Sequence, residues 1–524
     1  MEILYINPPK LNSGLDSIIK SPPLSLISLA AMVPNHGAHL FDFKVDDYDE
    51  KRFRSQLNRS DVVAISSMTP QIHHAFEVAE VAKEQGCTTI FGGYHPTLAP
   101  DYVVKNDNVD FTVRGEGENT FKEIIDFLNE DTHSETKKKD INGLSFKDEQ
   151  GNIRHNPDRG LECNLDNFPM PRRDLLDMSK YVYLGAQVAT LETSRGCPHN
   201  CKFCCIAQMW KDSRSHLSYR SKSLKRIMRE IYDIDLKNDF IFFCEDNFTI
   251  QVKRTKKILE TIKKSGIHHK INLSCQSRID TLYRNPWIID LMDETNMRQV
   301  FLGIESVHQQ SLNAMNKRNT TPEMTRKVVN MLHDRGISIF GGIIIGYPGE
   351  TKTMVRETIQ FARSLNLTCM QFTPITAFPG TQFYEEMKEA GRITTHNYKY
   401  YDLFHPMMRT EELTNIEMWR LVAEAYGATY LDREWMKTQA KRYLNPFGKF
   451  NWMLNNIPRF VKDVVVSGMD MLHTQGITGS AVSEELKNLM RFDRIEELLK
   501  YRAEKKEEEV LFEKPIEQMP KINN

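Results

Sequence analysis

Short apolar segments alternate with amphipathic ones in two separate stretches of this chain, and this pattern limits the fold more than any other feature. In the first stretch, residues 1–130, the apolar runs predict four buried strands: Glu2–Ile6, Val62–Ser66, Thr88–Phe91 and Val109–Val113. The segments between them predict three helices: Leu24–Met32, Ile72–Gln85 and Thr120–Leu128. Apolar strands that alternate with helices are typical of a doubly wound parallel sheet in an α/β protein.

The second stretch, residues 186–403, repeats the alternation with six predicted strands: Val188–Thr193, Phe240–Cys244, Asn272–Gln276, Gln299–Ile304, Ser338–Ile345 and Met370–Ile375. Helix signals lie between them. Thr321 followed by Pro322 is a helix start, and Gly336 marks the end of that helix. Six strands, each followed by a helix, predict a partial (β/α) barrel whose functional groups lie at the carboxyl ends of the strands.

The remaining segments differ in composition. Residues 131–185 hold a charged run, a predicted hairpin over 141–155, and Pro169 and Pro171, which force extended backbone; we expect a linker between two domains. Residues 404–500 predict a helical C-terminal domain. Residues 501–524 contain EKKEEE and little apolar surface, which predicts a disordered tail.

Composition excludes several classes of protein. Of the 524 residues, 40% are hydrophobic and 27% charged, which excludes wholesale disorder. Lys and Arg total 69 against 70 Asp and Glu, so we expect no nucleic-acid partner. The sequence shows neither a long apolar run nor a signal peptide, which predicts a cytoplasmic protein without a membrane span. Nine cysteines are an odd number and do not form a disulfide framework.

Three of these cysteines, Cys197, Cys201 and Cys204, form a C-x3-C-x2-C loop directly after a predicted strand. Three thiolates on one loop can each bind one iron of a 4Fe–4S cluster and leave the fourth iron open. Phe203 can shield such a cluster from water. Zinc is the alternative, but a zinc site needs a second ligand pair that the sequence does not offer. Cys205 does not fit the spacing, and packing is its simpler role.

The C-x3-C-x2-C loop at the start of a barrel resembles the radical S-adenosylmethionine (SAM) superfamily. The segments FCEDNFT, CQSRID, FLGIES, GGIIIGYPGET and FTPITAFPGTQFY follow the next five strands in the order in which that family places its nucleotide-binding motifs. The resemblance implies a cluster on the three cysteines and SAM on the open iron. The residues that it implies for SAM binding are Glu245 or Asp246, Gln276, Arg278, Glu305, Gly346, Pro348 and Gly349. A helix cap or an ion pair is the alternative role for the carboxylates.

The first stretch resembles the cobalamin-binding domain of class B radical SAM proteins. The segments NPP, SSMTPQ, GGYHPTLAP and VRGEGENTF carry this resemblance. The sequence has no GxGxxG motif, so a dinucleotide ligand is disfavoured. It implies cobalamin contacts from Ser66, Thr69, Gln71, Gly92, Gly93, His95, Gly115 and Glu116. The loop 66–71 would pack beneath the corrin. Because DxHxxG is absent, we expect no protein nitrogen on cobalt. A domain that serves only for docking is the competing hypothesis.

Together these features resemble cobalamin-dependent radical SAM methyltransferases and the anaerobic magnesium-protoporphyrin monomethyl ester cyclase. The resemblance implies transfer of a methyl group from methylcobalamin to an unactivated carbon, after hydrogen abstraction by the 5′-deoxyadenosyl radical. The substrate would be a small molecule or a protein residue, and the reductant a ferredoxin or flavodoxin. A cyclase or rearrangement enzyme is the alternative, and a redox sensor is a third hypothesis. Methyl transfer requires the N-terminal sheet edge to dock over the open barrel.

Overall fold

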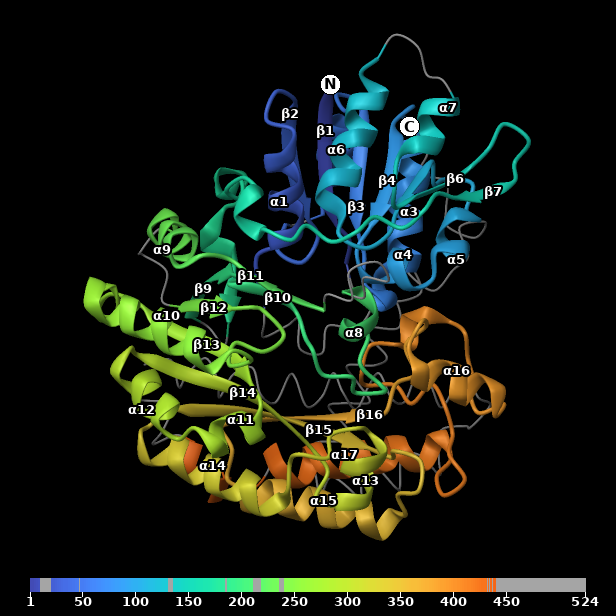
Figure 1. Cartoon of the computed structure of the whole chain (residues 1–524). Helices are drawn as coiled ribbons and strands as arrows, with labels where there is room; N and C mark the ends of the chain where they lie inside the picture. Colours follow the sequence, from blue (N-terminus) through green and yellow to red (C-terminus); the bar gives the residue numbers. More distant parts are fainter. Residues whose placement is uncertain are drawn as a thin grey trace.

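The computed structural model describes residues 1–9, 20–46, 48–130, 135–183, 186–210, 218–234 and 240–430, and residues 432, 434, 435 and 437–439. Within this part the chain forms two seven-stranded sheets and a two-stranded ribbon. Figure 1 shows the N-terminal sheet standing over the second, curled sheet. Most of the predicted C-terminal helical domain and the predicted tail, 501–524, lie outside the described residues.

The N-terminal sheet is doubly wound, as predicted. Its strand order is β2 (Gly37–Asp42), β1 (Glu2–Asn7), β3 (Val62–Ser66), β4 (Thr88–Gly92), β5 (Phe111–Val113), β6 (Leu144–Lys147) and β7 (Ile153–His155), and the first five strands are parallel. Two helices cover one face, α1 (Leu24–Met32) and α6 (Gly117–Leu128); two cover the other, α2 (Glu50–Leu57) and α3 (Ile72–Glu84). The chain reverses its order between β1 and β3. A ligand crevice is expected there, at the carboxyl ends of the strands.

Two strands of this sheet were less clear in the sequence. The predicted hairpin exists as β6 and β7, but it extends the sheet, because β6 pairs antiparallel with β5. The edge strand β2 was not predicted, since its exposed residues break the apolar run. Three short helices complete this half of the chain: α4 (Tyr94–Leu98), α5 (Pro100–Val104) and α7 (Glu135–Asp140).

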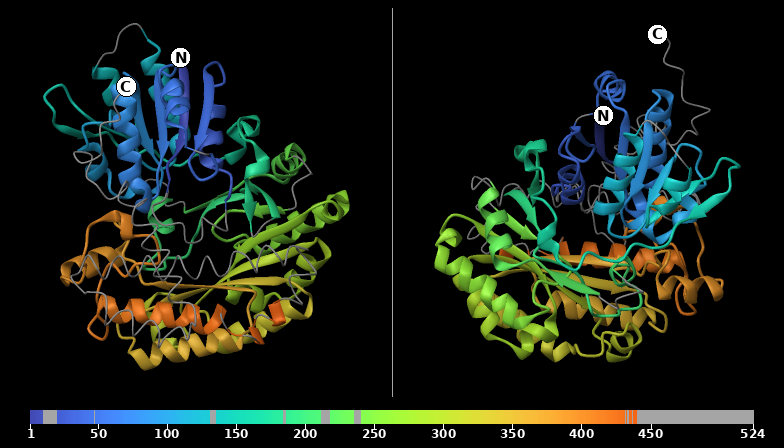
Figure 2. Two further views of the ribbon diagram at one scale, coloured as in Figure 1. Left: turned by 180° about the vertical axis from the view of Figure 1, so that it is seen from behind. Right: turned by 45° about the horizontal axis from the view of Figure 1, so that its top comes forward.

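The second sheet confirms the partial barrel. All six predicted strands are present, parallel and in chain order: β9 (Ala186–Leu191), β12 (Phe240–Phe243), β13 (Asn272–Ser277), β14 (Met297–Glu305), β15 (Ser338–Ile345) and β16 (Cys369–Pro374). The short strand β8 (Val182–Tyr183) adds antiparallel to β9. Figures 1 and 2 show most helices of this half on the side of the sheet that faces away from the N-terminal domain, whereas the short helix α8 (Ile206–Met209) lies between the sheet and that domain.

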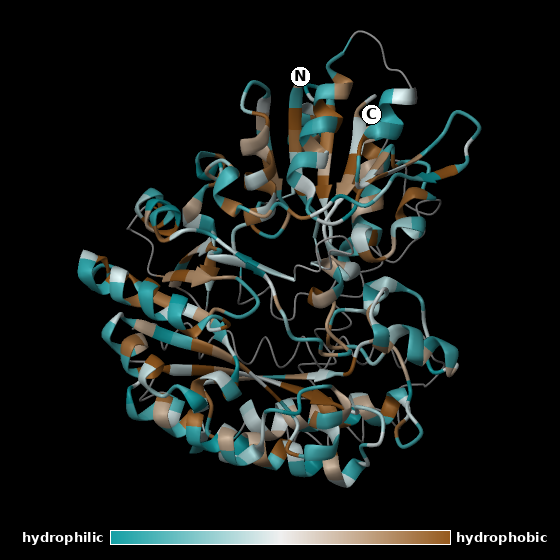
Figure 3. Cartoon of the chain, in the orientation of Figure 1, coloured by the Kyte–Doolittle hydropathy of each residue, from teal (hydrophilic) through white to brown (hydrophobic). Residues whose placement is uncertain are grey.

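The helices of the barrel half are α9 (Leu224–Asp233), α10 (Val252–Ser265), α11 (Ile279–Arg284), α12 (Trp287–Glu294), α13 (Gln309–Ala314), α14 (Pro322–Asp334), α15 (Lys352–Ser364), α16 (Gln382–Glu389) and α17 (Asn415–Tyr430). The start and stop signals predicted for α14 are both confirmed. The Thr321 side chain accepts a hydrogen bond from the Met324 amide at 3.2 Å, and Gly336 has a φ of 67° at the end of α14. Figure 3 shows that these helices cover apolar strands and that the outer faces of the helices are hydrophilic.

The two halves share one hydrophobic cluster. It contains Leu4 and Ile6 of β1 together with Tyr347 and Tyr384 of the barrel half. At its edge the ring of Tyr398 lies 4.8 Å from the ring of Tyr102, a residue of α5. The N-terminal domain is therefore docked on the barrel, as the predicted function requires.

The segment between the halves is held to both of them. The guanidinium of Arg226 on α9 donates to the carbonyl oxygens of Phe168 and Pro169 at 2.5 and 2.7 Å. Lys180 forms an ion pair with Asp46 of the N-terminal half at 2.7 Å. The segment thus fixes the docking, while the domain boundaries at 130, 185 and 403 stay a prediction. In the described part of the chain, no helix is both long and apolar enough to span a membrane.

Candidate functional site

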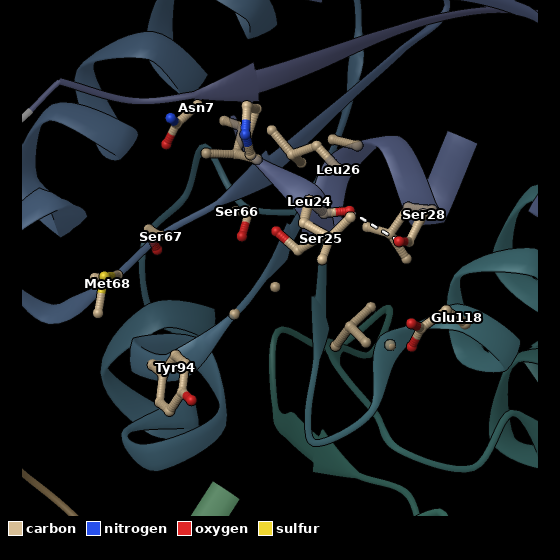
Figure 4. Close-up of a pocket in the computed structure, with 18 of the residues that line it drawn as sticks. Asn7, Leu24, Ser25, Leu26, Ser28, Ser66, Ser67, Met68, Tyr94 and Glu118 are labelled. Carbon is tan, nitrogen blue, oxygen red and sulfur yellow. Dashed lines mark hydrogen bonds between the residues drawn. The ribbon is translucent and has the colours of Figure 1, made fainter. Parts of the chain in front are cut away.

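A cavity of about 370 Å³ opens at the carboxyl edge of the N-terminal sheet, at the point between β1 and β3 where the strand order reverses. Figure 4 shows Ser66 and Ser67 on one side of it, Ser25 and Glu118 on the other, and Tyr94 below. The lining is not confined to the N-terminal domain, because Trp210 and Cys244 of the barrel half also contribute. The cavity therefore reaches the domain interface.

Close backbone approach shapes one wall. Gly93 has a φ of +102°, and a Cβ added there would lie 2.9 Å from the carbonyl oxygen of Ser67. Only glycine fits that position. Gln71 is buried and ties two loops together: its Nε2 donates to the Pro8 carbonyl at 2.6 Å, and its Oε1 accepts from the Met68 amide at 2.9 Å. The wall is thus built from backbone and small side chains, as a bulky ligand requires.

Six of the eight residues predicted to bind cobalamin line this cavity: Ser66, Gln71, Gly92, Gly93, Gly115 and Glu116. Thr69 and His95 do not. They lie behind the wall, where Nδ1 of His95 is 3.3 Å from Oγ1 of Thr69 and its ring lies 4.6 Å from that of Tyr398. Burial lowers the pKa of His95 to about 3. No histidine is among the described residues that line the cavity.

The three cysteines lie on one loop, between strand β10 (Ser194–Gly196) and the short helix α8 (Ile206–Met209). All three thiols are free and partly exposed. The loop is anchored on the barrel, because the Lys202 amide donates to the Met315 carbonyl and the Lys202 carbonyl accepts from the Phe383 amide, at 3.3 and 3.2 Å. Phe203 packs against the shared hydrophobic cluster. Its role as a shield of the iron–sulfur cluster stays a prediction.

The loop fits an iron–sulfur cluster by its chemistry. Burial raises the pKa of Cys197 to about 11 and that of Cys204 further, and the neighbouring Cys201 adds to both shifts. The positive charge of bound iron stabilises such thiolates. Among the described residues, no three His, Cys, Asp or Glu side chains are grouped as ligands of one ion. A cubane binds each thiolate to a different iron, so its ligands do not converge on one atom.

The two adjacent carboxylates after β12, Glu245 and Asp246, have different neighbours. Glu245 faces Thr193, whose hydroxyl and amide both donate to it. Asp246 lies close enough to Cys197, Cys204 and Tyr94 to raise the pKa of each. Burial raises the pKa of both carboxyl groups to about 7. Of the two predicted alternatives, Asp246 is therefore the one beside the cysteine loop, where a cationic ligand would stabilise its charge.

Glu305 ends β14 in a strained conformation. Its φ is +65°, which is rare for a residue with a side chain. Its carboxylate forms a 2.5 Å ion pair with Lys317, whose Nζ also donates to the Gly303 carbonyl at 2.6 Å. Arg278 after β13 pairs with Asp280 at 2.9 Å; burial lowers the pKa of its guanidinium, but Asp280 raises it overall, with smaller contributions from Cys201 and Cys197. These groups place compensated charges at the carboxyl ends of two neighbouring strands.

The remaining predicted SAM residues have mostly structural contacts. Gln276 donates to the Glu245 carbonyl at 3.4 Å. A Cβ at Gly346 would lie 3.1 Å from the Met418 side chain, so its small size serves packing against α17. Pro348 is partly exposed, and Gly349 is exposed with a φ of 90°. Glu350, in the same loop, accepts from the Ser306 hydroxyl at 2.8 Å and ties the end of β15 to that of β14.

The sequence did not reveal Tyr94, Arg195 or Lys317 as site residues. Tyr94 follows the predicted Gly92–Gly93 pair and lies next to Asp246 and the cysteine loop. A positional signal did exist for Arg195, which stands two residues before Cys197. Lys317 gave none, because twelve residues separate it from its partner Glu305.

Comparison with known proteins bears on this arrangement. A model described as the radical SAM superfamily matches residues 191–362, and one described as a B12 binding domain matches residues 20–125. An uncharacterized methyltransferase of Pyrococcus horikoshii, PH0819, is 33% identical over 444 residues, which cover 82% of this chain and 93% of that protein. The chain belongs to the B12-binding radical SAM methyltransferases.

Two further proteins of known name are similar to this radical SAM protein. The anaerobic magnesium-protoporphyrin IX monomethyl ester cyclase of Rubrivivax gelatinosus is 25% identical, over 83% of this chain and 79% of that protein. The cobalamin-dependent SAM radical enzyme OxsB, solved with aqua-cobalamin and SAM bound, has a TM-score of 0.68 at 17% identity, over 97% of this chain and 81% of that chain. The second likeness confirms the fold.

Family membership gives this radical SAM chain its cofactors: a 4Fe–4S cluster, SAM and cobalamin. The structure supplies a fitting place for each. The cysteine loop offers three thiolates for iron, Asp246 and the strand ends lie beside it for SAM, and the cavity of the N-terminal domain suits a large organic ligand. The individual contact residues stay a prediction.

Proposed function

We propose that this protein methylates an unactivated carbon atom with two molecules of SAM per turnover. One observation carries the proposal: the N-terminal cavity is lined by Trp210 and Cys244 of the barrel half as well as by the sheet loops. Trp210 directly follows α8, the helix at the end of the cysteine loop. The cavity expected to bind cobalamin therefore reaches the segment that follows the cysteine loop, which supports a substrate position within reach of both cofactors.

When bound, the cofactors supply a carbon radical from SAM and a methyl group carried on cobalt. The balance requires two SAM molecules. One loses its methyl group and leaves as S-adenosylhomocysteine. The other would take one electron and break into methionine and a 5′-deoxyadenosyl radical, which would remove a hydrogen atom from the substrate and leave as 5′-deoxyadenosine. The methyl group replaces that hydrogen, and a second electron returns cobalt to its starting state.

The residues of this chain hold and separate these groups. Asp246 beside the cysteine loop suits the cationic part of SAM. The loop 66–68 and Gly93 form the wall against which the corrin would pack. Phe203 and the shared hydrophobic cluster exclude water from the interface. The two electrons would come from a ferredoxin or flavodoxin, and the substrate would be a small molecule or a protein residue.

The second candidate function is a cyclase or rearrangement with the same cofactors, favoured by the similarity to the Rubrivivax enzyme. Only the methyltransferase must move a methyl group from SAM to cobalt. This step needs no substrate, so it can be tested with SAM alone as the probe.

The test uses full-length protein, reconstituted anaerobically with iron, sulfide and cobalamin, reduced to the cob(I)alamin state and mixed with SAM that carries a deuterated methyl group. Mass spectrometry of the corrinoid should show one labelled methyl group per cobalt, and S-adenosylhomocysteine should appear in equal amount. If cobalt stays unmethylated while the same preparation cleaves SAM to 5′-deoxyadenosine, the cyclase hypothesis replaces ours.

A further inference from the structure

Two buried arginines lie where the N-terminal domain meets the cysteine loop. Arg195 on β10 and Arg220 on β11 (Tyr219–Ser221) face each other in the antiparallel β10–β11 ribbon. Their side chains are 9% and 3% exposed. Such charges are buried only where partners compensate them.

Their shared partner is Glu116, which lies between β5 and α6 of the N-terminal domain. Its carboxylate accepts from Nη1 of Arg195 at 2.8 Å and, through both oxygens, from Nη1 of Arg220 at 2.9 Å. The Glu162 amide donates to it as well, at 2.8 Å. One carboxylate of the N-terminal domain thus holds two strands of the barrel half.

Arg195 makes two more ion pairs. Its Nη2 lies 2.7 Å from Glu118 in the first turn of α6, and its Nε lies 2.7 Å from Glu192 at the end of β9. The planar guanidinium uses all its nitrogens at once, which a lysine in its place could not do. The contact between the domains is therefore fixed in direction as well as in distance.

The indole of Trp210 lies against the same pair. The guanidinium carbons of Arg195 and Arg220 are 5.8 and 5.5 Å from its ring, within the range of a cation–π interaction. Trp210 also forms a hydrogen bond with Tyr94, the residue after Gly93 in the cavity wall. The N-terminal domain therefore also contacts the segment that follows the cysteine loop.

These contacts hold both ends of the cysteine loop. Arg195 lies two residues before Cys197, and Trp210 lies six residues after Cys204. A buried ion cluster adds little net stability compared with apolar packing, but it can favour one geometry over others. We propose that Glu116, Arg195, Arg220 and Trp210 form a clamp that fixes the distance and orientation of the iron–sulfur cluster relative to cobalamin. They are positioning residues and take no part in bond making.

The proposal rests on the cofactors of the family, and for the proposed function the clamp would set how far the methyl group travels. Its test needs neither substrate nor methyl transfer. Full-length protein loaded with both cofactors is reduced so that the cluster and cob(II)alamin are both paramagnetic. Pulsed electron paramagnetic resonance then measures the distribution of distances between the two spins. Wild type should show one narrow distance, and Arg220→Met should lose it in favour of a broad distribution.

Lys222→Met is the matched control. Lys222 lies two residues beyond Arg220 and is similarly buried, with a side chain that is 5% exposed. It pairs with Glu230, which also belongs to the barrel half, at 2.9 Å. Both substitutions remove one of two cationic partners of a buried carboxylate, because Glu116 keeps Arg195 and Glu230 keeps Arg226, and they should lower the melting temperature alike. Only Arg220→Met removes a contact between the two domains, so only this substitution should broaden the distribution of distances.

Arg220→Lys keeps the charge but not the planar guanidinium that lies against the Trp210 ring, and it should give an intermediate distribution. It also replaces Arg220→Met as the test variant if the latter does not bind both cofactors. A wild-type distance distribution in the Arg220 variant that binds both cofactors, or equal broadening in Lys222→Met, would overturn the proposal. Neither result would touch the proposed methyl transfer, which is measured separately.

Discussion

The two cofactor regions of this molecule are built on opposite principles. The barrel side offers titratable groups: three thiols, Asp246, whose pKa burial raises to about 7, and the Glu305–Lys317 ion pair on a strained backbone. The N-terminal cavity offers glycines, serines and apolar side chains, and the carboxylates Glu116, Glu118 and Glu192 that also line it are paired with Arg195. A metal cluster and a sulfonium ion are held by coordination and charge, whereas a corrin is held by shape. The two regions should therefore fail in different ways when they are changed.

The largest effect is expected on the barrel side. Replacing Cys197, Cys201 and Cys204 together by Ala removes every protein ligand of the cluster. Iron content and SAM cleavage should fall to background, while cobalamin binding in the other half should persist. Iron assays and the cobalamin absorption spectrum measure the two outcomes.

Cys205→Ala is the control for this result, because Cys205 is adjacent and its pKa is likewise raised to about 11 by burial. Its cluster spectrum should match that of wild type. Loss of the cluster in Cys205→Ala would show that the wrong sulfur had been assigned.

The next effect tests shape on the N-terminal side. Gly93→Ala places a Cβ 2.9 Å from the Ser67 carbonyl at a φ of +102°. The backbone strain alone costs roughly 1–3 kcal/mol, because φ and ψ lie in a region that is essentially restricted to glycine, and the steric contact must also move the 66–68 loop. Cobalamin affinity should fall about tenfold or more, at 1.4 kcal/mol per factor of ten. Iron content should stay unchanged.

Gly86→Ala separates strain from shape in that experiment. Gly86 ends α3 with a φ of +81°, and a Cβ there meets nothing within 4 Å. This variant should lose stability but keep its cobalamin affinity, as measured by equilibrium titration. Equal loss of affinity in both variants would mean that the Gly93 wall does not contact the corrin.

A smaller effect, on the pH dependence of stability, is expected from Glu245 on the barrel side. Burial raises the pKa of Glu245 from 4.5 to about 7 in the folded protein. Folding therefore favours the protonated form, and this contribution is complete below pH 4.5 and lost as pH rises through about 7. Glu245→Gln should gain about 2 kcal/mol relative to wild type between pH 5 and pH 8. Melting temperatures of the cofactor-free proteins at both pH values give the measurement, and a pH-independent difference would contradict it.

The smallest expected effect is none at all. Since no histidine is among the described residues that line the cavity, His73→Ala and His74→Ala should leave the electron paramagnetic resonance spectrum of cob(II)alamin unchanged. That spectrum should lack nitrogen splitting from an axial ligand. A splitting that disappears in either variant would place a histidine on cobalt.

Most of the fold could be predicted from the sequence, because buried parallel strands are continuous apolar runs. Val62–Ser66 and Ser338–Ile345 have the predicted bounds. The strands that were missed have no such run. β2 is an edge strand, and β10 and β11 are three residues each, with Arg195 and Arg220 at their centres. Both arginines pair with Glu116 of the N-terminal domain, a distant contact that no local sequence pattern predicts.

The site divides in the same way. The cysteines were predictable from spacing, because one loop carries all three ligands. Thr69 and His95 belong to motifs beside the cavity but lie behind its wall, since the chain turns between Gly93 and His95. The choice of Asp246 over Glu245 depends on a hydrogen bond from Thr193, which is remote in sequence. Contacts made by distant strands can be seen only in the folded chain.

The central claim is that the interface between the two halves brings both cofactors together. Electron paramagnetic resonance relaxation of cob(II)alamin tests it most directly, in wild type with a reduced cluster and in the variant without the three cysteines. The account predicts that the cob(II)alamin spin relaxes markedly faster in wild type, because a second paramagnet lies across the interface. Identical relaxation in the two proteins, with full cofactor loading of wild type, would contradict it.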